Sequence, residues 1–333
     1  MDVPRASDMV TIGLFTLTLL IASACASRPG ETWHSSPGRD HPLAGQIWDV
    51  GTASFIDATT LVGRLARSRF VLLGEKHDNP DHHRLQARLL RALVAAGRQP
   101  AVGFEMFDID QEKAIARHLA TAPTDAAGLA DAVHWDRTGW PDWALYQPIA
   151  AVALEAGLPI VATNLSRATA RALREHGPDG VEAGLVTRLG LDRPLAPDTH
   201  AAMAAEIRES HCGYASEPMV EAMITVQRAR DAQMAERLAA ASRQDGAVLI
   251  AGLGHVRTDW GVPAYLAAPL PGTTVVSLAF VEVGKGDTEP AAYASRFGRG
   301  PAPFDYVWFT PRVDDLDPCE KFRKQLKGLR KKP

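Results

Sequence analysis

Five short apolar runs, each bounded by polar or turn-forming residues, recur along the chain. They lie at residues 69–74, 100–105, 158–163, 247–251 and 273–279. Uninterrupted apolar runs of this length are typical of strands that are buried on both faces of a parallel sheet. Since helical stretches separate them, the pattern predicts an α/β fold with a mostly parallel central sheet flanked by helices.

A helix is expected between the first two of these strands. Asn79 is a favourable N-cap, Pro80 suits the first helical position, and Gly97 suits the residue after the helix end. Apolar side chains recur between them every four residues, at Leu85, Leu89 and Leu93. The resulting β-α-β unit should have a right-handed crossover.

Two longer regions, residues 108–157 and 166–241, have a helical pattern without an intervening strand. We expect them to form a helical subdomain or lid beside the sheet. The main α/β domain should then span residues 43–318, and residues 319–333 form a strongly basic C-terminal tail. Such a tail is typical of a solvated terminal helix, although it could also contact anionic lipid or another protein.

The N-terminus has the features of an export signal. Residues 10–24 form an uncharged stretch of 15 residues, which is shorter than a transmembrane helix but suits a signal peptide. The sequence Ala-Ser-Ala-Cys that ends at Cys25 resembles a bacterial lipobox, in which residues 1–24 are removed and the cysteine carries lipid. Ordinary cleavage after Ala24 also fits. Both alternatives place the mature protein outside the cytoplasm, with residues 25–42 as a tether that is rich in Ser, Pro and Gly.

Composition changes this picture by excluding several functions. The chain has 333 residues, of which 46% are hydrophobic and 23% are charged, and its net charge is −3. These values are typical of a globular protein and leave no broad basic face for nucleic acid. The sequence also lacks a phosphate-binding loop, a nucleophile elbow, a zinc helix and a covalent haem motif.

Polar side chains follow the predicted strands at their carboxyl ends, where open parallel sheets bind ligands. The first strand leads into Glu75 and His77, the second ends at Glu105, and the fourth leads into His255. A glycine three residues before each histidine should let the backbone turn off its strand. His77, Glu105 and His255 could hold a divalent metal, or one histidine could act as a general base. Alternatively, the histidines only bind loop carbonyls.

Arg230 is a further candidate on the long helix that follows Pro218. At 100° per residue, it shares a stripe with Met219, Met223 and Val226. A guanidinium on such a stripe requires a partner. Three partners are considered: Asp231, the carboxylates Glu75 or Glu105, and an anionic ligand.

Three further groups admit both a functional and a structural interpretation. His82 and His83 are expected to have capping and packing roles, with at most one of them facing the site. The loop that contains His211 and Tyr214 offers haem ligands, although such loop residues are usually ordinary surface. The aromatic residues around Tyr146 could line a flat cofactor, but the core of the helical region is favoured.

Five ordered segments resemble the ChaN family of iron-regulated, haem-binding bacterial lipoproteins within the Tiki superfamily. They are FVLLGEKHDNPDHHRLQARLL, AVGFEMFD, GLPIVATNLSR, HCGYASEPMVEAM followed by QRARDAQMAERL, and VLIAGLGHVRTDWGVPAYL. The resemblance runs from about residue 41 to residue 317. The wider superfamily, which includes the TraB proteins and the erythromycin esterases, shares two Gly-x-x-His elements, a glutamate and an arginine. These fall on His77, Glu105, Arg230 and His255.

The resemblance implies that haem binds at or near a homodimer interface, with a tyrosine as the iron ligand. Tyr214 is the first candidate and Tyr146 the second, with His211 in the same loop as the first. The leading hypothesis is a membrane-anchored lipoprotein of the bacterial cell envelope that binds haem for iron uptake. The alternatives are a metal-dependent or His/Glu-dependent hydrolase, which would use Glu75, His77, Glu105, Arg230 and His255, and a structural envelope protein.

The three cysteines support an exported protein. If Cys25 carries the lipid, Cys212 and Cys319 remain as an even pair in an oxidising compartment. We therefore predict a disulfide between Cys212 and Cys319.

Overall fold

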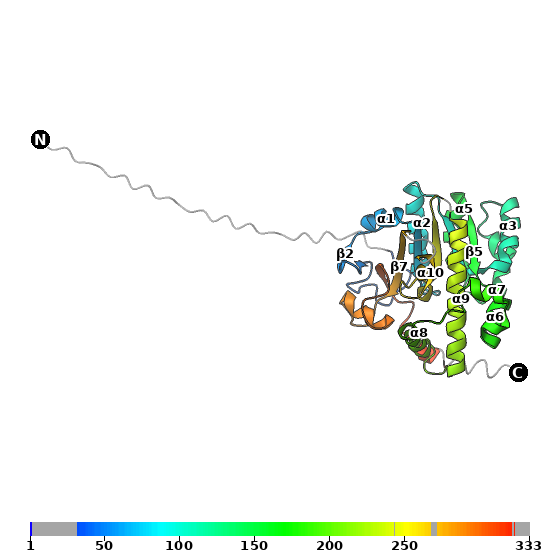
Figure 1. Ribbon diagram of the computed structural model, residues 1–333. Coiled ribbons are helices and arrows are strands. Elements are labelled where there is room, and N and C mark those ends of the chain that lie inside the picture. Colours follow the sequence, from blue (N-terminus) through cyan, green and yellow to red (C-terminus); the bar gives the residue numbers. More distant parts are fainter. Residues whose placement is uncertain (2–31, 243, 268–271, 322, 324–333) are drawn as a thin grey trace. The chain divides into compact units, whose positions relative to one another are not determined.

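Eight strands in the described part of the chain form one sheet in the order β2-β1-β8-β7-β3-β6-β4-β5 (Figure 1). The parallel centre consists of β3 (Phe70–Glu75), β4 (Ala101–Asp108), β5 (Ile160–Asn164), β6 (Ala247–Gly252) and β7 (Val275–Glu282). These five strands coincide with the five predicted apolar runs. The prediction of an α/β fold with a mostly parallel sheet is therefore confirmed.

Three strands at one side of the sheet were not predicted. β8 (Tyr306–Thr310) is parallel to β7, and β1 (Ile47–Asp49) is antiparallel to β8. β2 (Ser54–Ile56) is antiparallel to β1 and forms the outer edge. Residues close to both ends of the folded region thus complete the same sheet.

Helices connect and cover the strands. They are α1 (Ala58–Ala66), α2 (Pro80–Ala95), α3 (Glu112–Thr121), α4 (Gly128–Ala132), α5 (Trp143–Glu155), α6 (Arg167–His176), α7 (Ala183–Arg188), α8 (Pro197–Ser210), α9 (Glu217–Ala241) and α10 (Val262–Ala267). Both regions that were expected to be helical are helical. They are not wholly a separate lid, because α5 contacts β5 and α9 contacts β4, β5 and β6.

The beginning of α2 follows the sequence signals closely. The Asn79 side chain accepts a hydrogen bond from the Asp81 backbone N–H, and Pro80 occupies the first helical position. Gly97 follows the helix end with φ +84°, a left-handed conformation that favours glycine. This helix carries His82 and His83 in its first turn, next to the end of β3.

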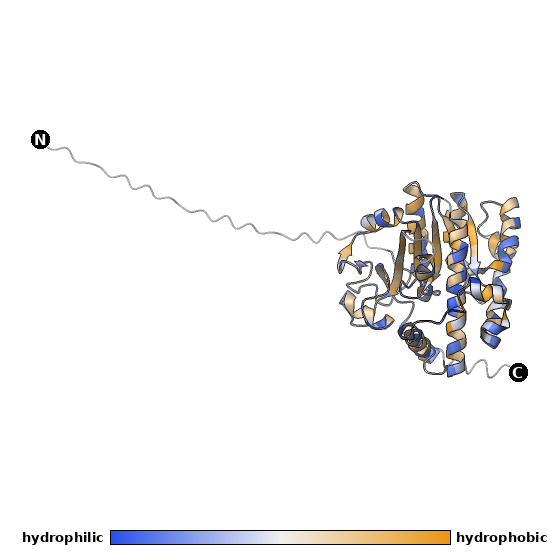
Figure 2. Ribbon diagram, viewed as in Figure 1, coloured by the Kyte–Doolittle hydropathy of each residue, from blue (hydrophilic) through white to orange (hydrophobic). Residues whose placement is uncertain are grey.

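Two hydrophobic cores cover the two faces of the sheet. One contains side chains of α1, α2 and α5, including Leu61, Leu89 and Ile149. The other contains side chains of α9 and α10, including Leu238 and Leu266. Figure 2 shows the hydrophobic colouring concentrated on the central strands, with hydrophilic residues along the outer helix surfaces. Since helices cover both faces, the carboxyl edge of the strands is where a site can open to solvent.

The structure describes residue 1, residues 32–242, 244–267 and 272–321, and residue 323. The predicted signal peptide, the lipid-anchor candidate Cys25, the first part of the tether and residues 324–333 of the tail lie outside the described residues. Within the described residues, no helix combines the length and hydrophobicity needed to cross a membrane.

Candidate functional site

Glu75, the last residue of β3, is the centre of a buried polar cluster. Its side chain is 0% exposed, and its Oε1 lies 3.0 Å from His77 Nδ1 and accepts a 3.0 Å hydrogen bond from the Tyr146 hydroxyl. Its Oε2 lies 3.0 Å from His83 Nδ1. Burial would raise the pKa of Glu75, but His83 and His77 lower it to about 2. Glu75 is therefore a carboxylate that holds three side chains in place.

His83 also belongs to this cluster, although the sequence analysis did not assign it there. The packing role that was expected for both histidines of α2 is confirmed for His82, whose Nε2 contacts Thr310 Oγ1 at 2.8 Å. His83 instead faces Glu75, so the expectation was wrong for this residue. The signal was its position in the first turn of a helix that starts at the end of β3.

Tyr146 does not suit the role of an iron ligand. Its side chain is fully buried, and burial together with Glu75 raises its pKa far above the ordinary value of a phenol. The phenol therefore stays protonated and donates to Glu75. The neighbouring Trp135 and Trp143 pack against Tyr146 in the core, as the structural interpretation of these aromatics predicted.

A second buried cluster lies at the ends of β4 and β6. Glu105 Oε2 accepts a 2.7 Å hydrogen bond from the Gly252 backbone N–H, and its Oε1 lies 3.2 Å from His255 Nε2. His255 Nδ1 lies 2.6 Å from Asp231 Oδ1. Although burial opposes the charged form, the two carboxylates raise the pKa of His255. His255 is therefore an imidazolium that donates from both ring nitrogens.

This clamp, formed by the two contacts with Glu105 and Asp231, occupies both ring nitrogens of His255, which disfavours two of the roles that were considered for this residue. A doubly protonated imidazole has no lone pair for a metal and cannot act as a general base. In the part of the chain that the structure describes, no group of three or more His, Cys, Asp or Glu side chains is arranged to hold a metal ion. The expected metal site of His77, Glu105 and His255 is thus not supported. The clamp also binds Asp231, so Asp231 is not the partner of Arg230.

His77 is the member of the two clusters that reaches the surface, because its side chain is 35% exposed. Trp140 packs edge-on against its ring, with centroids 4.9 Å apart. Burial would lower the pKa of His77, but the hydrogen bond to Glu75 and the charge of Glu105 raise it overall. The ring also lies directly on Gly252, where an added Cβ would be 2.9 Å from His77 Nε2. His77 thus stands between Glu75 and Glu105.

The two glycines that precede the histidines allow close packing of neighbouring side chains, and they do not adopt a left-handed turn conformation. In the described chain, neither Gly74 nor Gly252 has a positive φ. A Cβ on Gly74 would lie 2.3 Å from a methyl group of Val256, and a Cβ on Gly252 would collide with His77. Their expected role as turn residues was therefore wrong, and close packing explains them.

Gly252→Ala should lower the free energy of unfolding by about 1–3 kcal/mol, because the His77 ring must move to admit the new methyl group. Gly254→Ala is the matched control, since its nearest contact is 3.8 Å away at Gln227 Nε2. Urea denaturation of both variants measures the difference. Equal stability of the two variants would contradict this explanation.

Arg230 lines an open cavity of about 370 Å³ between α8, α9 and the end of β6. Its Nε is buried without a hydrogen-bond partner. Within the described residues it forms no ion pair with Glu75 or Glu105, so those two expected partners are wrong. Other lining side chains include Arg174, Met203, Ile207, His211, Met223 and Trp260. Arg230 is therefore oriented toward a cavity that combines apolar walls with charged groups, which include the carboxylate Glu206 that is paired with Arg257.

The loop after α8 contributes one of the two haem-ligand candidates to this cavity. His211 lines it, and its Nδ1 lies 2.8 Å from the Ile207 carbonyl oxygen. Tyr214, in the same loop, is 54% exposed. The predicted disulfide between Cys212 and Cys319 is present, with Cα atoms 5.6 Å apart. It ties this loop to the beginning of the C-terminal tail.

Together these features define an α/β protein with two buried histidine–carboxylate clusters and an open cavity at the carboxyl edge of its sheet. The profile of the family described as haem-binding uptake, Tiki superfamily, ChaN matches residues 61–266, which is more than half of the chain. The chain belongs to this family.

One solved structure shows the same fold, and two further structures were matched with lower TM-scores. ChaN of Campylobacter jejuni, whose structure concerns cofacial haem binding, is 20% identical with a TM-score of 0.61, over 79% of this chain and 95% of that one. An erythromycin esterase mutant is 14% identical with a TM-score of 0.44, over 86% and 99%. The type III effector HopBA1 is 15% identical with a TM-score of 0.42, over 76% and 92%. A comparison with curated proteins found no match.

Proposed function

We propose that this protein binds haem and takes part in haem or iron uptake at the bacterial cell envelope, where Cys25 anchors it to a membrane. Its membership of a haem-binding uptake family carries the proposal. The lipobox-like sequence that ends at Cys25 supports export and lipidation. Haem is the cargo in this function, so no chemistry is required of the protein beyond binding and release.

The cavity that contains Arg230 is the site that we propose for haem. Its volume of about 370 Å³ lies within the range of small-molecule sites. Methionine and tryptophan side chains would contact the porphyrin plane, while Arg174 and Arg230 would pair with the two propionates. The buried Nε of Arg230, which lacks a partner among the described residues, supports an anionic ligand at this position.

We place the iron beside His211. Histidine is an ordinary axial haem ligand, and His211 lines the cavity. This placement departs from the sequence-based expectation, in which Tyr214 was the first candidate, because the exposed Tyr214 side chain would reach haem only from the rim. The cavity is open, so part of the porphyrin would stay uncovered. A second copy of the chain, as the family resemblance implies, would cover that part.

The test is a titration of the purified mature protein with haem. Binding should shift the Soret band and saturate at a fixed ratio of haem to protein. An unshifted spectrum over the whole titration would refute the proposal.

A hydrolytic function is the second candidate, and the Glu75–His77 pair favours it. Glu75 orients His77 through Nδ1, so that Nε2 carries the lone pair when the imidazole is neutral. His77 is partly exposed, unlike the clamped His255. This arrangement resembles the base-and-orienter pair of acid–base enzymes, and haem binding gives no reason for it. His77, and not His255, would be the base that activates water.

The rate at which the protein hydrolyses simple activated esters, measured at a series of increasing pH values, tests this candidate. His77→Gln should lower the rate by about 100-fold or more, because a positioned base contributes at least that factor. His211→Ala, which leaves the Glu75–His77 pair intact, should keep the rate. An ester hydrolysis that is absent, or that His77→Gln leaves unchanged, would exclude the hydrolytic function.

A further inference from the structure

A second and larger hollow lies on the other side of Trp260 from the proposed haem cavity. Its volume is about 800 Å³, and it runs along α9 between the α7–α8 connection and α10. Ala232, Ala235 and Ala239 form its floor. Leu189 and Leu195 from the α7–α8 connection supply apolar walls. The hollow is therefore a groove with an apolar lining.

The groove is elongated. Arg228 and Ala239 both line it and lie 11 residues apart on α9. At 1.5 Å per residue this separation corresponds to a length of about 16 Å. An extended acyl chain fits such a shape better than a compact polar metabolite does.

Positive charge at the Arg228 end of the groove is not neutralised by the protein. Three of the lining charges are compensated, because Arg188 pairs with Glu236, and Asp259 binds Arg257. Arg228 instead donates to the backbone carbonyls of Gly190 and Arg193. In the described chain, neither the Arg193 nor the Arg228 side chain forms an ion pair with a carboxylate, and Arg228 Nε is buried without a hydrogen-bond partner.

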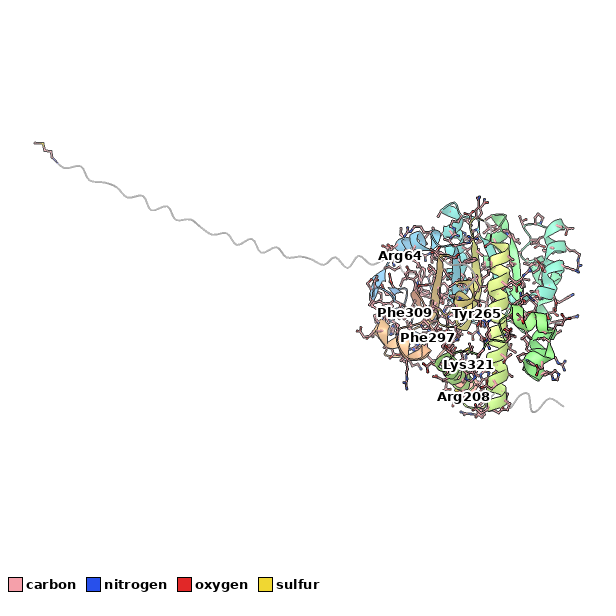
Figure 3. All side chains as sticks on the ribbon, in the orientation of Figure 1. Arg64, Arg208, Tyr265, Phe297, Phe309 and Lys321 are labelled. Carbon is pink, nitrogen blue, oxygen red and sulfur yellow. A yellow bond between two sulfur atoms is a disulfide. The ribbon has the colours of Figure 1, made fainter. Side chains whose placement is uncertain are left out.

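Tyr265, on α10, adds a hydrogen-bond donor to the same groove (Figure 3). Burial and the charge of Asp231 raise the pKa of Tyr265, while Arg228 beside its hydroxyl opposes this shift. The phenol is therefore protonated at neutral pH. Two guanidinium groups and a phenol can together bind one carboxylate.

We propose that this groove binds a single-chain amphiphile with a carboxylate head group, of the fatty-acid class. The head lies at Arg193, Arg228 and Tyr265, and the acyl chain runs along the alanines of α9 toward Ala239. This site is separate from the proposed haem cavity and does not depend on the proposed function. No covalent step is involved.

The probes are octanoate, decanoate and dodecanoate, titrated into the purified protein by calorimetry. Affinity should rise with chain length by up to about 4-fold per methylene, since each added group leaves water for the alanine floor. Ala239→Phe should abolish dodecanoate binding by filling the groove. Ala240→Phe, on the exposed neighbouring position, is the matched control and should bind as the wild type does.

The head-group contact has its own variant. Arg193→Gln should weaken binding about 10-fold by removing one charge-assisted hydrogen bond. Arg137→Glu, at a side chain that is 77% exposed and outside the groove, should have no effect. Three results would overturn the proposal: no binding of dodecanoate, binding that Ala239→Phe leaves intact, or competition between dodecanoate and haem. Ala239→Phe should bind haem as the wild type does. This result would show that the loss of dodecanoate binding does not depend on the haem proposal.

Discussion

His211→Ala is expected to abolish the haem-induced shift of the Soret band. The proposal places the iron beside His211, whose ring is oriented by the contact between its Nδ1 and the Ile207 carbonyl oxygen. Removing the imidazole removes the axial ligand and leaves only contacts to the porphyrin plane and the propionates. Absorbance spectra of wild-type and variant protein, titrated with haem under the same conditions, measure this loss.

Tyr214→Phe is the matched control, because it changes the exposed candidate in the same loop and should keep the wild-type spectrum. Arg230→Gln should retain the spectrum but weaken binding by about 10-fold, since one propionate loses a charge-assisted contact. A normal spectrum in His211→Ala together with a lost shift in Tyr214→Phe would assign the iron to Tyr214 and refute the placement at His211.

Replacing Cys212 and Cys319 together by serine should lower the free energy of unfolding by about 4 kcal/mol. The bridge joins residues that are 107 positions apart, and cross-links that close long loops restrict the unfolded chain most. The same variant should also loosen the loop that carries His211. Urea denaturation with and without reductant measures the effect.

The control for this experiment is the reductant itself. Wild-type protein should fall to the stability of the double variant when its disulfide is reduced, whereas the double variant should not respond. Equal unfolding midpoints for oxidised wild type and the double variant would show that the bridge does not stabilise the fold.

The centre of the sheet could be predicted because its strands are continuous apolar runs of ordinary length, such as the run that became β3. The side strands could not be predicted equally well, for two reasons. β1 and β2 contain only three residues each, which is too short for a periodic pattern. β8, with its aromatic and β-branched residues, did carry a strand signal, but it lies in a region rich in turn-forming residues.

The candidate site was predicted only in part, because some of its residues lie at strand ends and others lie on helices. Glu75, His77, Glu105 and His255 follow strands, and parallel topology alone brings strand ends together. Asp231 was not recognised as the partner of His255, because that contact joins α9 to the end of β6 over a long stretch of chain. A signal existed, since Ile224, Asp231 and Leu238 are spaced seven residues apart and are all buried. A carboxylate on that stripe requires a partner inside the fold.

Trp260 lines both the proposed haem cavity and the acyl groove, and so forms the wall between them. The Arg257 guanidinium lies 3.6 Å from the centre of its ring and is itself bound to Glu206 and Asp259. A ligand on one side can change the affinity on the other only by moving this wall, and any such coupling is reciprocal. Because these ion pairs hold the ring in place, the two sites should bind their ligands independently. A ligand in the groove should therefore leave the affinity for haem unchanged.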